Sequence, residues 1–187
     1  MIYAKKELET MAEEVWEEQK TKRFTPFNLE DYVADLGIPM HPIGFLKSVS
    51  SRDVAYFRGV AKDKLSAYTI MFGFQERVIF YNDVHHPNRR RSDIAHEVAH
   101  ALLMHEPSPP LTSDGQRNFD KTVEGQAAHL GAALLIPRSQ AINSAFSDRS
   151  NAEIAEIFEV SEQLALWRMN STAARTIVAR ARKKRTR

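Results

Sequence analysis

The sequence predicts an α+β fold that is mainly helical, with a small antiparallel sheet of about three strands and a helical C-terminal segment. Apolar residues recur at three-to-four spacing in stretches before residue 37 and after residue 92, as on one face of a helix. Aromatic and β-branched residues concentrate between residues 41 and 82, as in strands. The 187 residues are 43% hydrophobic, which is enough to bury a core.

Two helices are predicted at the start of the chain. The first runs from Lys5 to Lys20, and its apolar face consists of Leu8, Met11, Ala12, Val15 and Trp16. The second begins at Asn28, a good N-cap residue with Asp31 three positions later, and ends at Gly37.

The three strands are predicted in the segments VAYFRGV, AYTIMFGF and ERVIFYN, which short polar or glycine-containing turns separate. A polar loop, HHPNRRR, follows, and Pro87 disfavours helix before it. Ser92-Asp93 can then cap a helix over about 93–104. The proline-rich stretch from Pro107 to Gly115 is expected to be a loop long enough to cover a site.

Helices are predicted for most of the remaining chain. One runs from about Phe119 to Leu135, and three shorter ones cover 138–146, 151–158 and 161–180. We expect two parts: a catalytic domain over residues 1–149, and a C-terminal helical segment with a basic tail over 150–187.

Composition narrows the chemistry and the compartment. The chain has no cysteine, so a disulfide framework and a thiolate zinc site are excluded, and any metal must bind to His, Asp or Glu. The first 20 residues are too acidic for a signal peptide, and no run approaches ~18 apolar residues. We therefore expect a cytoplasmic protein that does not enter a membrane.

The predicted helix 93–104 contains His96, Glu97 and His100, which form the motif His-Glu-x-x-His. Residues four apart lie one turn above each other, so both imidazoles can bind one ion at the ~2.0–2.1 Å that zinc requires. Glu97 lies about 100° around the helix from His96, where it can reach a water on the open side of the metal and act as a general base. The alternative is two hydrogen-bonded core histidines.

A catalytic zinc needs a third protein ligand. Glu124 is the chosen candidate, because it is an acid early in an otherwise apolar helix, 24 residues after His100. Asp120, one turn earlier, could instead orient a ligand imidazole. His129, on the same helix, is an alternative ligand or a hydrogen-bond donor to the transition state.

Other residues near the motif have simpler interpretations. The turn before the helix is expected to be solvated, although its side chains could contact a substrate or a ligand; they are His85, His86, Arg89, Arg90 and Arg91. His105 lies five residues past His100 and does not continue the ligand face, so it is interpreted as a helix-end residue that the helix dipole favours.

These segments resemble the ImmA/IrrE family of metallopeptidases over nearly the whole chain. NLEDYVADLGIPM is similar to an early family helix and turn, ERVIFYN and IAHEVAHALL to the strand that leads into the metal helix, and EGQAAHLGAALLIP to the second family signature. The resemblance implies a zincin-like fold in which His96, His100 and Glu124 bind metal and Glu97 activates water. Two departures are Gln126, where an acid is common, and Leu130-Gly131 in place of Phe-Ala.

The resemblance also implies a substrate, because family members cleave a helix-turn-helix transcriptional repressor and thereby release genes of a stress response or a mobile element. The prediction is therefore a zinc-dependent endopeptidase, with Mn²⁺ or another divalent ion as the alternative metal. The alternative function is a non-proteolytic regulator that binds DNA or a repressor and whose metal site is structural or vestigial.

That alternative depends on residues 150–187. Two helices joined at Glu159-Val160 resemble a helix-turn-helix, but their glutamates would face phosphates and few base-reading groups precede Arg168, so a packing element is favoured. The tail 175–187 has seven Arg or Lys residues and no acid, whereas residues 1–174 carry 19 basic and 24 acidic residues, a net charge of −5. The tail could contact nucleic acid weakly, or it is a solvated helix end.

Overall fold

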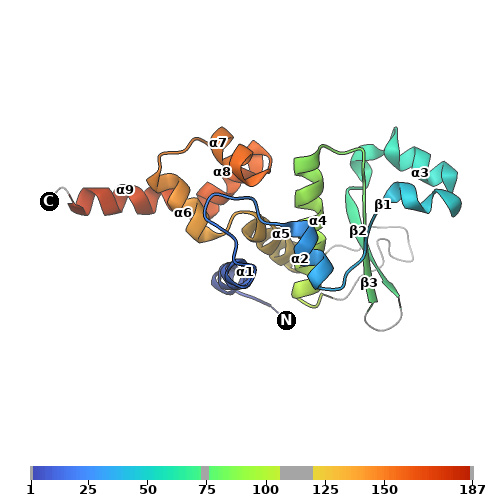
Figure 1. Ribbon diagram of the computed structural model, residues 1–187, viewed down its shortest axis with the longest axis horizontal. Helices are drawn as coiled ribbons and strands as arrows, with labels where there is room; N and C mark the ends of the chain where they lie inside the picture. The colour runs from blue at the N-terminus through green and yellow to red at the C-terminus, as the bar shows by residue number, and fades with distance from the viewer. Residues whose placement is uncertain (1, 73–75, 106–119, 186–187) are drawn as a thin grey trace. The chain divides into compact units, whose positions relative to one another are not determined.

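The computed structural model describes residues 2–72, 76–105 and 120–185, and the chain divides into two compact units. One unit comprises residues 1–2 and Leu29–Gly131, and the other comprises Tyr3–Asn28 and Ala132–Arg187. The described elements are α1 (Lys5–Glu18), α2 (Leu29–Asp35), β1 (Met40–Pro42), η1 (Ile43–Ser48), α3 (Ser51–Arg58), η2 (Lys62–Lys64), β2 (Ala67–Phe72), β3 (Glu76–Tyr81), α4 (Pro87–Leu102), α5 (Lys121–Leu135), α6 (Arg138–Phe146), α7 (Asn151–Phe158), α8 (Glu162–Ser171) and α9 (Ala174–Arg185) (Figure 1). The predicted class, mainly helical α+β, is confirmed.

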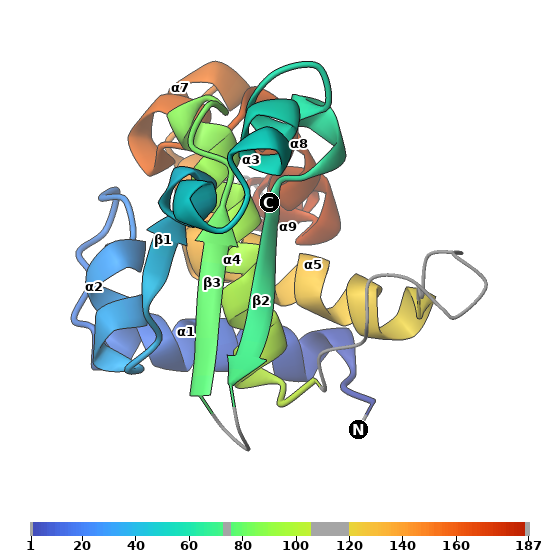
Figure 2. The same ribbon diagram turned by 90° about the vertical axis from the view of Figure 1, so that its right-hand side faces the viewer.

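The sheet belongs to the first unit and has three strands in the order β1-β3-β2. β2 is antiparallel to β3, as predicted, with Thr69 opposite Ile79. β1 is parallel to β3, with Met40 opposite the same residue, so the sheet is mixed and not purely antiparallel. Helix α4 packs against β2 and β3 (Figure 2). The central strand buries Ile79 and Phe80, whose side chains lie on opposite faces of the sheet because they are consecutive strand residues.

The first predicted strand, VAYFRGV, is wrong, because this segment forms helix α3 and its continuation. Ser50 caps the helix by accepting a hydrogen bond from the backbone N–H of Asp53, at 3.3 Å. Val54 is buried, but Tyr56 is 45% exposed and Val60 is 90% exposed, so the segment lacks the alternating burial of a strand. The capping signal outweighs the β propensity of its aromatic and β-branched residues. The third strand of the sheet is β1 instead.

Helix α4 starts six residues earlier than the predicted residue 93. His86 caps it by accepting a hydrogen bond at Nδ1 from the backbone N–H of Asn88, at 3.3 Å. Pro87 is the first helical residue, where its fixed φ is favourable and its missing N–H costs nothing. The helix ends at Leu102, and Met104 then adopts a left-handed backbone with φ of 53°.

The second unit is helical. α1 buries Leu8, Ala12, Val15 and Trp16 as predicted, whereas Met11 is half-buried. Trp16 donates its indole N–H to the carbonyl oxygen of Leu134 at 2.6 Å. The guanidinium of Arg168, on α8, is fully buried and binds both carboxylate oxygens of Glu9, at 2.7 and 2.8 Å. These contacts tie the N-terminal helix to the C-terminal helices of the same unit.

The predicted helices 138–146 and 151–158 are confirmed as α6 and α7, but the predicted helix 161–180 is broken. Ala173 adopts a φ of 53°, which separates α8 from α9. The predicted domain boundary between residues 149 and 150 stays a prediction. The loop predicted over 107–115 lies outside the described residues. Within the described ranges, no helix combines the length and the apolar character needed to cross a membrane.

Candidate metal centre

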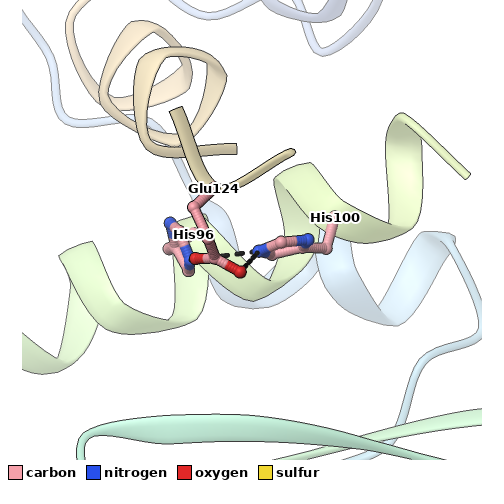
Figure 3. Close-up of side chains that lie close together, drawn as sticks. All are labelled: His96, His100 and Glu124. Carbon is pink, nitrogen blue, oxygen red and sulfur yellow. Dashed lines mark hydrogen bonds and ion pairs between the residues drawn. The ribbon is translucent and has the colours of Figure 1, made fainter. Parts of the chain in front are cut away.

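Helix α4 places His96 and His100 one turn apart, with their imidazoles facing the same point. Their Nε2 atoms are 3.1 Å from each other. The two rings meet nearly edge to face, with centroids 4.7 Å apart. Figure 3 shows both rings pointing toward a third side chain, Glu124, which α5 contributes. The helical spacing of the motif therefore produces the convergence that the sequence predicts.

Glu124 lies in the first turn of α5, and its carboxylate reaches both imidazoles (Figure 3). Its Oε2 is 3.2 Å from His96 Nε2, and its Oε1 is 3.6 Å from His100 Nε2. In the part of the chain that the structure describes, these three residues form the one group of His, Asp or Glu side chains whose donor atoms converge as metal ligands would. The choice of Glu124 over Asp120 and His129 thus agrees with the geometry.

The separations between the three donor atoms fit a small divalent ion. Four ligands at the ~2.0–2.1 Å typical of zinc would lie about 3.3–3.4 Å from one another at the corners of a tetrahedron. The observed separations are 3.1, 3.2 and 3.6 Å. The side chains of His96 and Glu124 are 30% and 34% exposed, so the site is not closed on all sides. Two nitrogens, one carboxylate and an accessible side are a donor set that could hold a divalent ion and leave a position open.

The environment keeps His100 in the form that a metal needs. Burial, together with the neighbouring His96, His105 and Arg77, lowers the pKa of His100 to about 3. A metal binds only the neutral imidazole, because the ligand must offer a lone pair. His100 is therefore ready to bind a cation without losing a proton.

Glu97 follows His96 on α4 and is held by the sheet. The hydroxyl of Thr69, on β2, donates to Glu97 Oε2 at 2.6 Å. Burial raises the pKa of the Glu97 carboxyl, while the Thr69 hydrogen bond and the nearby His96 oppose this rise. A carboxyl whose proton affinity is raised by burial is suited to accept and release a proton. Thr69 was not identified from the sequence, because only the packing of α4 on β2 brings it to the motif.

His105 and Gln126 also lie at the site, although His105 was interpreted differently from the sequence. His105 is 7% exposed, and its Nδ1 lies 3.0 Å from His100 Nδ1. Its Nε2 lies 3.3 Å from the side-chain oxygen of Gln126, which is 6% exposed. His105 is therefore a buried residue in contact with a candidate metal ligand, and the interpretation as a helix-end residue that the dipole favours is wrong.

The other sequence candidates have structural contacts. Asp120 Oδ1 accepts hydrogen bonds from the first turn of α5, at 2.8 Å from the N of Thr122. His85 is buried, with Nε2 2.8 Å from the Lys62 carbonyl oxygen. The remaining ones lie as follows: His86 caps α4, Arg89 pairs with Asp63, Arg91 pairs with Glu30, Arg90 is half-buried and His129 is buried on α5.

Comparison with known proteins identifies a family for much of the chain. A family model described as the IrrE N-terminal-like domain, a peptidase family, matches residues 50–170, which is more than half of the chain. The matched range contains the sheet strands β2 and β3, the whole of α4 and α5, and all the residues of the candidate centre. Neither the curated proteins nor the solved structures gave a match.

Proposed function

Because the chain belongs to the IrrE N-terminal-like peptidase family and so carries a metallopeptidase-like domain, we propose that it is a zinc-dependent endopeptidase that cleaves a protein substrate. The observation that carries this proposal is the convergence of His96, His100 and Glu124 at the separations of a tetrahedral site. Zinc is proposed over Mn²⁺ because two of the three donors are imidazoles. Imidazole suits zinc, whereas Mn²⁺ prefers oxygen ligands.

His96 Nε2, His100 Nε2 and the Glu124 carboxylate would hold the ion. A divalent ion in such a site supplies Lewis-acid chemistry, since it polarises a peptide carbonyl and lowers the pKa of water from 15.7 to about 7. Glu97 Oε2 is engaged by Thr69, which leaves Oε1 to act on the substrate. This oxygen takes one proton from the attacking water as the new C–O bond forms. It then delivers the proton to the leaving amine nitrogen as the C–N bond breaks.

The sheet offers a place for an extended substrate. β2 lies at an edge in the described strand order, and it carries Thr69, which contacts Glu97. The backbone groups of an edge strand can pair with an added peptide strand, and main-chain hydrogen bonds then bind it without regard to its sequence. A peptide that runs along β2 passes Glu97 in mid-chain, which favours cleavage within a chain over removal of a terminal residue.

The proposed substrate is a helix-turn-helix transcriptional repressor, cleaved in the cytoplasm during a stress response or the activation of a mobile element. Support for this class comes from the resemblance to the ImmA/IrrE family. Because family members often cleave a repressor that is encoded nearby, a repressor encoded beside the gene for this chain is the first substrate to test.

The competing function, direct DNA binding by the α7–α8 pair, has less support. Arg168 is the basic residue of α8 that would read bases, but it is 0% exposed and bound to Glu9. The exposed α8 residues include Glu162 and Trp167, which offer no positive charge to phosphates. For the basic tail over 175–187 we propose only weak, salt-sensitive contact with nucleic acid, because Arg180 and Arg185 of α9 are exposed.

The proposed function is tested by incubating the zinc-loaded chain with the adjacent repressor and measuring intact masses of the products. The wild type is expected to give two fragments that sum to the repressor plus one water, and a chelator should abolish cleavage. Glu97→Gln should retain zinc and lose about 10²–10⁴-fold in rate. Glu76→Gln, the same change at an exposed position of β3, should cleave at the wild-type rate. Equal cleavage by Glu97→Gln would refute the role of this residue, and an uncut repressor would exclude it as the substrate.

A further inference from the structure

The chain reverses direction directly after α4, and this reversal brings His105 back over His100. Met104 adopts a left-handed φ of 53°, and the backbone N–H of His105 donates to the carbonyl oxygen of His100 at 2.9 Å. Met104 N–H donates to the carbonyl oxygen of Ala101 at 3.0 Å. These two bonds form a Schellman motif, in which the residue after the left-handed one usually makes an apolar contact with the residue five before it. Here the contact joins two imidazoles.

The contact continues through a second polar link. His105 Nδ1 is 3.0 Å from His100 Nδ1, and His105 Nε2 is 3.3 Å from Gln126 Oε1. His105 and Gln126 are 7% and 6% exposed. The backbone of His105 is held as well, because Arg77 donates from Nη2 to its carbonyl oxygen at 3.0 Å. Burying two polar side chains beside a ligand is costly unless their hydrogen bonds are made, so this arrangement has a defined pattern of donors.

When His100 binds metal, only one arrangement of protons satisfies the contacts between His100, His105 and Gln126. His100 Nε2 faces His96 and Glu124, so its lone pair must lie there and its one proton must lie on Nδ1. That proton is donated to His105 Nδ1, which must then be an acceptor. The proton of His105 consequently lies on Nε2 and is donated to the amide oxygen of Gln126, which can only accept.

We propose that His105 and Gln126 are positioning residues that fix the proton of His100 on Nδ1 and thereby direct its Nε2 lone pair toward the metal. This inference rests on the proposed metal centre, but it concerns residues that do not touch the metal or the substrate. A ligand imidazole commonly donates to a carboxylate or a backbone carbonyl. Here the acceptor is a second imidazole whose own orientation an amide sets, so the tautomer is selected without adding a charge.

The proton positions are measured first, by ¹H–¹⁵N NMR of histidine side chains in the metal-free and zinc-loaded chain. The expected result in both states is a proton on Nδ1 of His100 and on Nε2 of His105. In metal-free Gln126→Leu, the proton of His105 should no longer be confined to Nε2. A wild-type spectrum with the His105 proton on Nδ1 would overturn the proposal, whatever the enzymatic activity of the chain.

Zinc affinity is measured next, by competition with a chromophoric chelator. His105→Phe keeps a planar aromatic ring but has no ring nitrogen, and it should weaken zinc binding by about 10- to 100-fold. Gln126→Leu should weaken it in the same direction, and Gln126→Glu, which still accepts the hydrogen bond, should restore binding to within a few-fold of wild type. His41→Phe on β1, which is half-buried and far from His105 and Gln126 in the sequence, is the matched control and should bind zinc as wild type does.

The outcomes separate this inference from the proposed function. If His105→Phe and Gln126→Leu both bind zinc with wild-type affinity, His105 and Gln126 have no positioning role, while the peptidase assignment stands. If the wild type itself fails to bind zinc, the proposed function fails, and the NMR result still decides the proton positions. If His105→Phe does not fold, Gln126→Leu and the wild-type spectrum decide the question.

Discussion

A β-carbon on Gly131 would lie 2.8 Å from the carbonyl oxygen of Ala95 and 3.0 Å from the Cα of His96. No side chain larger than hydrogen fits there, because both neighbours belong to the backbone of α4. Glu124 lies seven residues earlier on α5, about two helical turns away. The close approach at Gly131 therefore sets how near Glu124 comes to the two histidines.

Gly131→Ala is predicted to push α5 away from α4 and to weaken the metal centre. The added methyl should cost about 1–3 kcal/mol of unfolding free energy as overpacking, and zinc affinity should fall because Glu124 moves with its helix. Chelator competition and chemical denaturation measure the two effects.

Gly125→Ala provides the control for this substitution. A β-carbon on Gly125 meets nothing within 4 Å, so alanine should leave zinc affinity unchanged and stabilise α5 by up to about 1 kcal/mol. Similar zinc affinities for Gly131→Ala and Gly125→Ala would show that the contact between the two helices does not set the position of Glu124.

Thr69→Val is predicted to slow cleavage without affecting metal binding. The valine keeps the shape of threonine but removes the 2.6 Å hydrogen bond to Glu97 Oε2, so the carboxylate loses its fixed orientation. A hydrogen bond to a charged group contributes about 1.5–3 kcal/mol, so a rate loss of about ten-fold or more is expected. Steady-state cleavage of the repressor and zinc titration give the two quantities. Thr69→Ser keeps the hydroxyl and should remain close to wild type, and equal losses in both variants would contradict the role of the hydroxyl.

Arg168→Met is predicted to destabilise the second unit strongly. The substitution removes the guanidinium that binds Glu9 and also the donor to the carbonyl oxygen of Ile136 at 2.7 Å. Breaking a buried ion pair from one side costs about 3–5 kcal/mol. The double variant Arg168→Met, Glu9→Gln should recover part of this loss in urea denaturation. A single variant as stable as wild type would show that the pair contributes nothing to folding.

The stability of α7 is predicted to depend on pH through Glu153. The backbone N–H and the hydroxyl of Ser150 donate to this carboxylate at 2.8 Å and lower the pKa of Glu153 below its ordinary value of 4.5. A carboxyl with a lowered folded-state pKa stabilises the fold above its unfolded-state pKa, and this stabilisation disappears as the pH falls through the folded-state value. Wild type should therefore have a higher Tm than Glu153→Gln at pH 7, and the difference should shrink as the pH falls below 4.5 through the lowered folded-state pKa. A difference that stays constant throughout an acid titration would exclude the charge as its cause.

Much of the candidate centre could be predicted from the sequence, because its main signal is local. His96 and His100 are one turn apart on any α-helix, and Glu124 is an acid at the start of an apolar helix. Thr69 depends on which strand packs under α4, and no spacing in the sequence encodes that contact. Gln126 was noted only as a departure from the family pattern, although a polar residue within an apolar helix is itself a signal of a buried polar contact.

His105 and α3 were misjudged for related reasons. The position of His105 depends on Met104, which adopts a left-handed backbone that glycine usually supplies, so the reversal of the chain carried no glycine signal. In α3, β-branched and aromatic residues predicted a strand, whereas the Ser50–Asp53 cap favoured a helix. The parallel pairing of β1 was not foreseeable either, because only three residues form that strand.

Anomalous diffraction at the zinc absorption edge, from crystals of the zinc-loaded chain, tests the central claim most directly. The account predicts one strong peak within about 2.0–2.2 Å of His96 Nε2, His100 Nε2 and a carboxylate oxygen of Glu124. A peak bound by other side chains, with these three left uncoordinated, would contradict it.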